Sequence, residues 1–249
     1  MIVIRLVGLF ACLVVLMGPF YDNAEAESGR PDAGVIKFDA YRNGNHFGFS
    51  MLRIEGPEGG ETVDVVTALR VGLGPFTAFK YLLRTRSKWR NGKIARLESV
   101  VNDDGEIFKL TARQQGRGVA VDGSEGRYAA PIDIVPTTYW KRGLVHQSQL
   151  LNTQHGGIFN VTVERGGEGL VVSEGRELMA TRYLVRGDLD IDIWYDTRDE
   201  WVKLTFKVGD SNVEYKRVTP RPVDMKAFVN FETVPEVSGS DVHAMIDPG

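Results

Sequence analysis

Hydrophobic and polar residues alternate with a period of two along most of residues 35–218. The clearest example is the stretch 79–90, "FKYLLRTRSKWR". Its two faces consist of Phe79, Tyr81, Leu83, Thr85, Ser87 and Trp89 on one side, and Lys80, Leu82, Arg84, Arg86, Lys88 and Arg90 on the other. Successive side chains of a strand point to opposite sides, so this period predicts half-buried β-strands.

Short turn signals separate the alternating segments. Asn43-Gly44 and Asn91-Gly92 are pairs that favour tight hairpin turns with positive φ. Further glycine-containing signals occur at residues 59–60, 103–105, 116–118, 122–123, 165–167, 174–175 and 209–210. Strands joined this way pair with their sequence neighbours, so we expect about a dozen strands in a meander. An antiparallel sheet of that size tends to curl, which predicts an all-β fold with a strongly curved sheet.

Residues 137–155 interrupt the alternation. Thr137 or Thr138 can cap a helix, and Trp140, Leu144, Ser148 and Leu151 follow at helical spacing before Gly156-Gly157. Gly143 in the middle weakens a helix, because glycine costs roughly 1 kcal/mol against alanine there. The pattern predicts one or two short helical turns that act as a lid or plug on the sheet.

The N-terminal residues have the three-part pattern of a secretory signal peptide. Arg5 precedes an apolar run over residues 6–17, and small residues stand at Ala24 and Ala26. The run is shorter than the roughly 20 residues of a membrane-spanning helix, so we expect cleavage after Ala26 and export to the bacterial periplasm. Membrane contact is expected only through an uncleaved signal or a lipid anchor at Cys12, which the bulky Phe10 and the apolar run after the cysteine disfavour.

The chain is therefore divided into a signal peptide (1–26), a flexible N-terminus (27–34), an antiparallel β domain (35–218) and a proline-containing, partly disordered tail (219–249). A brief edge strand within "AFVNFE" is the alternative for the start of the tail.

Composition excludes several classes of function. The 30 Lys and Arg against 33 Asp and Glu give a net charge of −3, so there is no basic excess for binding nucleic acid. Loss of Cys12 with the signal leaves no disulfide and no thiolate metal site. The sequence "GLGPF" at 72–76 lacks the lysine of a phosphate-binding loop and is interpreted as a bend between strands. No cofactor is expected.

Asp188, Asp190 and Asp192 alternate along a predicted strand and would share one face. Residues two apart on a strand lie about 6.5 to 7 Å from each other, too far for all three to hold one ion. We interpret them as a solvated face opposite the cationic ladder of Lys80, Arg84, Arg86 and Lys88, although an adjacent pair of aspartates could share a cation. The residues between and beyond them, Leu189, Ile191 and Ile193, are expected to face the core.

His146 and His155 are the candidate catalytic side chains of the interrupting segment. An unbroken helix would place them on opposite sides, because it turns by about 100° per residue. Neither lies in a nucleophile-elbow pattern. A hydrolase that uses His146 with Tyr139 or Asp192 is retained as an alternative hypothesis, and the expectation is that the protein is not an enzyme.

Several segments together resemble a known family. They are "GNHFGF", "RTRSKWRNGKIARLESVVNDDGE", "YAAPIDIVPTTYWKRGLVHQSQLLNTQHGG" and "GDLDIDIWYDTRDEWVKLTF". They are similar to a bacterial family of exported proteins described as domain of unknown function 6134, related to number 3108, over roughly residues 35–218. Lys141 and His155 depart from its usual Asn and Thr. The resemblance implies an antiparallel, strongly curved sheet or an incomplete β-barrel, broadly similar to periplasmic lipoprotein-carrier folds, and it implies no reaction.

The favoured hypothesis is a non-enzymatic envelope protein that binds an apolar or amphipathic ligand, or a lipoprotein partner, in the concavity of the sheet. The alternative to both binding and catalysis is a structural or interaction module with a filled core. The predicted ligand-binding residues are Phe79, Tyr81, Leu83, Trp89, Tyr139, Trp140, Leu144, His146 and Leu151.

Overall fold

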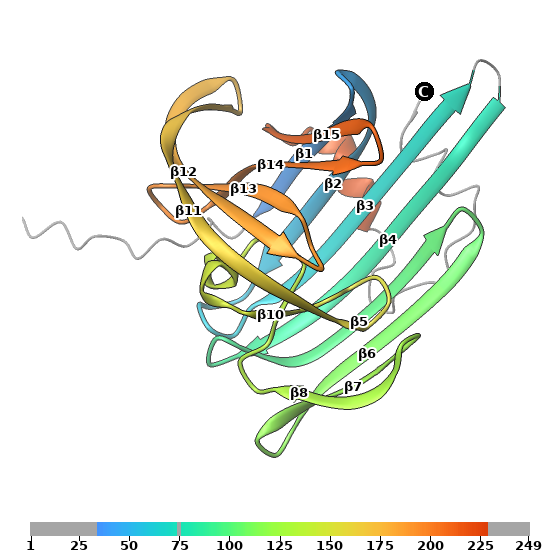
Figure 1. Ribbon diagram of the computed structural model, residues 1–249, viewed down its shortest axis with the longest axis vertical. Coiled ribbons are helices and arrows are strands. Elements are labelled where there is room, and N and C mark those ends of the chain that lie inside the picture. Colours follow the sequence, from blue (N-terminus) through green and yellow to red (C-terminus); the bar gives the residue numbers. More distant parts are fainter. Residues whose placement is uncertain (1–33, 74–75, 229–249) are drawn as a thin grey trace, which may run out of the picture.

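The computed structural model describes residues 34–73 and 76–228, which form one curved β-sheet and two short 3₁₀ helices (Figure 1). The sheet has 15 strands in the order β8-β7-β6-β5-β4-β3-β2-β1-β15-β14-β13-β12-β11-β10-β9. All pairings are antiparallel except that between β9 and β10. The predicted all-β class and the strongly curved, unclosed antiparallel sheet are therefore confirmed.

The first half of the chain contains β1 (Val35–Arg42), β2 (Asn45–Glu55), β3 (Thr62–Leu73), β4 (Phe76–Arg90), β5 (Lys93–Asp103), β6 (Glu106–Gln115), β7 (Gly118–Gly123) and β8 (Gly126–Pro131). The second half contains β9 (Val135–Pro136), η1 (Arg142–His146), β10 (Gln149–Leu151), β11 (Ile158–Ser173), β12 (Arg176–Gly187), β13 (Ile191–Asp196), β14 (Trp201–Val208), β15 (Ser211–Val218) and η2 (Pro222–Phe228).

The first and last strands meet in the middle of the sheet. β1 pairs with β15 in a register that runs from Lys37 opposite Val218 to Arg42 opposite Val213. The two outer strands, β8 and β9, come from the middle of the chain. The inner face of the sheet is therefore assembled from both halves of the sequence.

The sheet curls far enough for its two ends to touch. The Tyr128 hydroxyl on β8 donates a hydrogen bond to the Gly156 carbonyl at 2.8 Å, beside the end of β10. The backbones of Gly123 and Gly156 approach so closely that a Cβ atom on Gly156 would lie 3.0 Å from the Cα of Gly123. Contacts of β7 and β8 with the loop after β10 thus hold the two ends of the sheet together, where β8 and β9 form no ladder.

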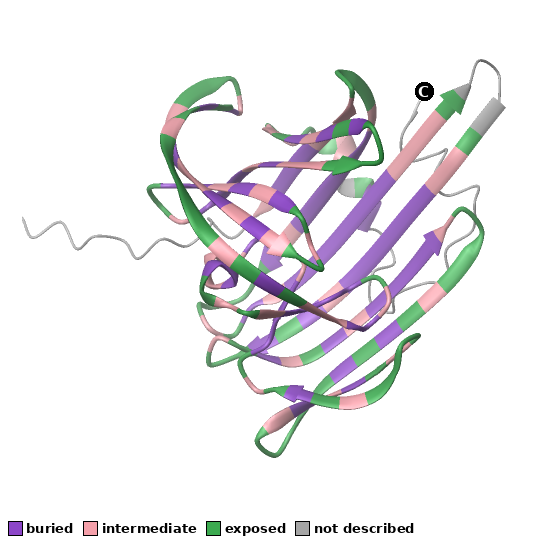
Figure 2. Ribbon diagram, viewed as in Figure 1, coloured by how far each residue is buried: buried purple, intermediate pink, exposed green. Residues whose placement is uncertain are grey.

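Apolar side chains bury both faces of the sheet, as the continuous buried stretches along β2 to β5 show in Figure 2. The largest cluster fills the inside of the curve and includes Leu52, Ile94 and Ile193. A second cluster lies on the outer face, where Phe228 of η2 covers residues of β2 to β4. A third forms where the β11–β12 hairpin folds back and Val171 packs near Val202 of β14.

The structure corrects several boundaries expected from the sequence. Residues 165–167 form a bulge inside the continuous strand β11, because the ladder shifts between Arg165 and Glu168 without breaking. Residues 188–190 form the connection between β12 and β13, so one long strand was the wrong prediction there. The helical segment is a single 3₁₀ helix of 5 residues.

The ends of the chain lie mainly outside the described residues. The predicted signal peptide, Cys12 and most of the predicted flexible N-terminus fall there, as do residues 74–75 and 229–249. The structure places Ala227 and Phe228 in η2, where an edge strand was the alternative. Among the residues that are described, no helix is both long and apolar enough to span a membrane.

Candidate functional site

A cavity of about 550 Å³ lies inside the curve of the sheet. Its walls come from β1 to β4 on one side and from β13 to β15 on the other, with the segment before η1 and the loop after β10 also contributing. Val65, Leu83, Ile191, Leu204 and Val213 are among the aliphatic side chains that line it. The pairing of β1 with β15 brings these two walls together, so the cavity is a product of the sheet's curvature.

A row of aromatic rings lies along one side of the cavity, where Trp201, Tyr215 and Phe206 line it. The rings of Phe38 and Trp201 stack at 3.8 Å between centroids, and Tyr139 lies 5.4 Å from Trp201. Tyr215 continues the row at 6.5 Å from Trp201, with Phe206 at 6.0 Å from Tyr215. Contacts at these distances add to the free energy of burial and fix the orientation of the rings.

The segment that interrupts the strand pattern closes part of this cavity. Tyr139 has a φ of 64°, an unusual value for a residue with a side chain, and its carbonyl accepts a hydrogen bond from the Tyr195 hydroxyl at 2.7 Å. The hydroxyls of Thr137 and Thr153 lie 3.0 Å apart and tie the two lining stretches together. Residues 137–139 and 153–154 thus contribute to the cavity lining.

Three phenol groups line the cavity. Among the described residues, the hydroxyls of Tyr81, Tyr139 and Tyr215 form no hydrogen bond. Burial raises the pKa of all three, and for Tyr81 the neighbouring Tyr215, Asp103 and Tyr139 raise the pKa further. They remain protonated at neutral pH and can each donate a hydrogen bond to a molecule in the cavity.

Arg42 is the single charged residue that lines the cavity within the described part of the chain. Its Nε donates a hydrogen bond to the Ser211 hydroxyl at 2.9 Å, across the junction of β1 and β15. No carboxylate of the described residues lies within ion-pair distance of its guanidinium.

The predicted ligand-binding residues divide into two sets. Phe79, Tyr81, Leu83 and Tyr139 line the cavity. The other five lie outside the cavity lining. His146 is exposed, and the remaining four are buried in the core, namely Trp89, Trp140, Leu144 and Leu151.

Trp89 and Trp140 pack against each other outside the cavity lining. Their rings meet edge to face at 5.4 Å, and the Lys141 ammonium lies 4.5 Å from the centre of the Trp89 ring. Leu144 and Leu151 are fully buried in the same core cluster. The register of β4 with β5 shifts at this point because Ala95 is an extra residue of β5, so the alternation along β4 is unbroken. Trp89 therefore belongs to the same inner core cluster as Leu83, but it lies nearer the end of the strand and outside the cavity lining.

The candidate catalytic residues are not brought together. His146 is exposed and, within the described residues, forms no hydrogen bond or ion pair. Tyr139 faces the cavity, whereas Asp192 alternates with the cavity-lining Ile191 and projects to the opposite face of β13. There Asp192 accepts hydrogen bonds from Arg182 and Arg186. His155 packs edge to face against Phe108, with ring centres 4.2 Å apart.

The aspartates of residues 188–192 also differ from the expectation. Asp188 accepts hydrogen bonds from Asn160, and Asp190 pairs with Arg186 at 3.0 Å. Arg86 was expected to lie opposite these aspartates, but it instead donates two hydrogen bonds to Asp64 of β3. The proposed pairing of the two faces is therefore wrong, while Leu189, Ile191 and Ile193 do face inward. Across residues 34–73 and 76–228, no group of three potential metal ligands occurs.

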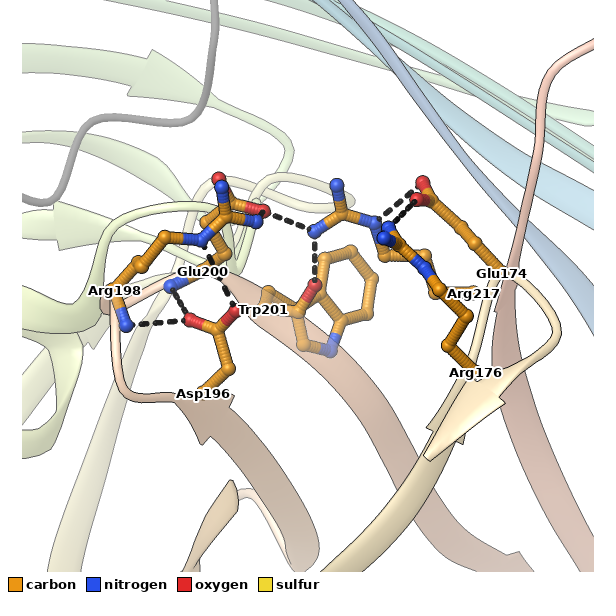
Figure 3. Close-up of polar contacts among 7 residues, drawn as sticks. All are labelled: Glu174, Arg176, Asp196, Arg198, Glu200, Trp201 and Arg217. Atoms are coloured by element: carbon orange, nitrogen blue, oxygen red, sulfur yellow. Dashed lines mark hydrogen bonds and ion pairs between the residues drawn. The ribbon is translucent and has the colours of Figure 1, made fainter. Parts of the chain in front are cut away.

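A network of ion pairs and hydrogen bonds among charged side chains surrounds the start of β14, the strand that carries Trp201 (Figure 3). Arg217 of β15 donates hydrogen bonds to Glu200 at 2.6 Å and to Glu174, at the tip of the β11–β12 hairpin, at 3.0 Å. The Asp196 carboxylate accepts a hydrogen bond from the backbone N–H of Glu200 at 2.9 Å. The network thus joins the tip of the β11–β12 hairpin, β15 and the start of β14. It thereby holds in place the backbone next to Trp201, one of the aromatic residues that line the cavity.

Sequence reasoning missed the half of the cavity that β13 to β15 supply. Leu189, Phe206, Val208 and Tyr215 all line it, as does Arg42. The alternation along residues 201–218 was the available signal for which side chains face inward. It did not show which other strands they would face, because that depends on the pairing of β1 with β15.

Comparisons with known proteins extend the description of the fold. A similar solved structure is the crystal structure of a β-barrel-like protein of the domain of unknown function DUF1849 from Brucella abortus, with a TM-score of 0.53 and 12% sequence identity. The match covers 74% of this chain and 95% of that one, and at this identity it concerns the fold alone. No curated protein matches the chain. The model of the family described as "Domain of unknown function (DUF6134)" matches residues 38–218, nearly the whole sheet, and the chain therefore belongs to the DUF6134 family.

Proposed function

We propose that this protein is a non-enzymatic binding protein of the bacterial periplasm that holds an apolar or amphipathic molecule inside its curved sheet. The observation that carries the proposal is the cavity of about 550 Å³ with aliphatic and aromatic walls. Cavities that bind small molecules commonly measure about 300 to 1,000 Å³ and combine apolar walls with a few polar groups.

The polar groups of the cavity also favour binding over a purely structural role. A packed protein interior leaves few voids larger than a water molecule and pairs its polar groups. Here the hydroxyls of Tyr81, Tyr139 and Tyr215 have no protein partner within the described residues. A bound amphipathic molecule would fill the space and accept their hydrogen bonds.

A pair of leucine substitutions tests the proposal. Leu69 of β3 lines the cavity, so Leu69→Trp is expected to occupy part of the volume and to weaken binding of the neutral fluorescent probe N-phenyl-1-naphthylamine by about tenfold or more, which corresponds to ~1.4 kcal/mol. Leu170 of β11 is 65% exposed and lies outside the cavity, so Leu170→Trp is the matched control and should bind like the wild type. Fluorescence titration measures both affinities.

Organic extraction of the purified protein, followed by mass spectrometry, provides the second test. The wild type should carry a lipid-like molecule that Leu69→Trp lacks. Absence of any such molecule, together with no binding of the probe to the wild type, would leave the cavity without a ligand and contradict the proposal.

A further inference from the structure

We infer that the molecule held in the cavity is an anionic amphiphile and that Arg42 binds its charged group. This inference rests on the proposed function, because it identifies the class of ligand for the same cavity. It depends on the charge distribution of the lining, which was not needed to propose binding itself.

The charge of Arg42 is isolated in the cavity lining. Arg42 is the one charged residue that the described part of the chain contributes to the lining, and no acidic residue lines the cavity with it. A charge beside an apolar space loses part of its hydration, and an anion in that space would offset this cost. The protein supplies no such anion from its described residues, so the ligand is the natural source.

The Arg42 guanidinium also has a geometry that suits an anionic group. Its Nε is used by the hydrogen bond to Ser211 at 2.9 Å, which orients the side chain across the β1–β15 junction. Within the described residues its two terminal nitrogens donate no hydrogen bond. A planar pair of N–H donors matches the two oxygens of a carboxylate or phosphate, which arginine binds with parallel hydrogen bonds.

The strand register places Arg42 at one end of the cavity. Arg42, the last residue of β1, pairs with Val213 of β15, and Ala40, two residues earlier in β1, pairs with Tyr215. The guanidinium therefore belongs to the end of the cavity next to the β1–β2 turn, while Phe38 and Trp201 stack towards the other end. A ligand with its anionic group at Arg42 would direct its apolar part along the aromatic wall.

Displacement of the neutral probe N-phenyl-1-naphthylamine tests this assignment with three competitors: palmitate, hexadecyl phosphate and uncharged hexadecanol. The wild type is expected to bind both anionic competitors about tenfold or more tightly than hexadecanol. Arg42→Gln should lose this preference while it still binds hexadecanol as the wild type does. Arg42→Lys keeps a positive charge and should keep part of the preference. Comparison of palmitate with hexadecyl phosphate shows which anionic group is favoured.

The control is Arg117→Gln, which removes one positive charge from the exposed β6–β7 turn and should leave every affinity unchanged. Equal affinity of the wild type for all three competitors would overturn the inference but leave the proposed function intact. Failure of the wild type to bind the probe and every competitor would overturn both. If Arg42→Gln does not fold, the preference of the wild type and its partial retention in Arg42→Lys decide the question.

Discussion

At the scale of single residues, Asp192 shows how a carboxylate on the outer face of the sheet is paired. Its carboxylate accepts hydrogen bonds from Arg182 and Arg186. Burial alone would raise the pKa of Asp192, but the hydrogen bonds from the two arginines outweigh it and lower the pKa below its usual value. The cavity differs, since within the described residues its one charged side chain, Arg42, has no ion-pair partner and three of its phenol hydroxyls form no hydrogen bond.

The lowered pKa of Asp192 predicts a pH dependence of stability. A carboxyl with a lower pKa in the folded state contributes stability above its unfolded pKa of about 3.9 and loses it as the pH falls through the folded value. Asp192→Asn should therefore lower the free energy of unfolding near neutral pH, and its difference from the wild type should shrink below about pH 4. Urea denaturation at a series of pH values measures this difference.

Asp190→Asn is the matched control for this measurement. The Asp190 side chain is 78% exposed, so its ion pair with Arg186 is screened by solvent and the substitution should change stability little. A difference between Asp192→Asn and the wild type that stays constant down to pH 2 would show that the ionised carboxylate is not what stabilises this site.

At the scale of elements, irregular positions in the strands determine the shape of the cavity. The ladder between β1 and β2 shifts between His46 and Gly48 of β2, because Ala40 pairs with Gly48 and the next residue, Tyr41, pairs with His46. The extra residue is Phe47, which lines the cavity. Gly48 has a φ of 153°, and a Cβ atom there would lie 2.1 Å from the carbonyl oxygen of Ala68. Glycine is thus required where the backbone of β2 passes close to β3.

Gly48→Ala should consequently destabilise the fold by at least about 2 kcal/mol, because β2 or β3 has to shift to make room for the methyl group. Gly169→Ala in β11 is the control, since a Cβ atom there meets nothing within 4 Å. Chemical denaturation should show a large loss for the first variant and almost none for the second. Similar values for the two would mean that β2 accommodates the methyl group without cost.

The turn signals in the sequence predicted most hairpins correctly, but one signal inside β11 wrongly predicted the end of a strand. The turns at Asn43-Gly44, Asn91-Gly92 and Glu174-Gly175 are where the strands reverse. Residues 165–167 carry a similar glycine signal, yet they form a bulge, at which a Cβ atom on Gly166 would lie 2.2 Å from Leu184. A turn and a bulge both use glycine, so composition alone cannot separate them.

At the scale of the whole molecule, the fold extends past the last strand. Phe228 of η2 is only 4% exposed and packs in the outer cluster with residues of β2 to β4, and the Arg53 guanidinium lies 5.0 Å from the centre of its ring. Lys37 adds an ion pair with Asp224 at 3.0 Å. Residues after Val218 thus cover apolar surface of the sheet, although the predicted β domain ended there.

Phe228→Ala is therefore expected to lower the free energy of unfolding by about 3 kcal/mol, as is usual for removal of a buried phenylalanine ring. Binding of the neutral probe should be unchanged in the folded variant, because Phe228 lies on the face of the sheet opposite the cavity. Lys226→Ala in the same helix removes an exposed side chain and should have little effect on either measurement. A stability close to that of the wild type for both variants would show that η2 does not stabilise the sheet.

The sequence predicts which side chains of a strand face inward, but it does not predict which distant strands they face. The period of two identified which side chains of β4 face inward, and so placed Phe79, Tyr81 and Leu83 correctly on the cavity wall. The partners across the cavity could not be predicted, because turn signals specify only pairings between neighbours in the chain. Arg42 and Ser211 are 169 residues apart in the sequence, and no local pattern connects them.

The junction of β1 with β15 has a consequence for the order in which the chain folds. Hairpins between sequence neighbours can form early, because little chain entropy is lost in closing a short turn. The first strand, by contrast, has to wait for the last one, and until β15 arrives its free edge is exposed to other chains. Joining β1 to β15 is thus expected to be a late and slow step of folding, and the same step completes the binding cavity, so a partly folded chain has neither a protected edge nor a complete site for its ligand.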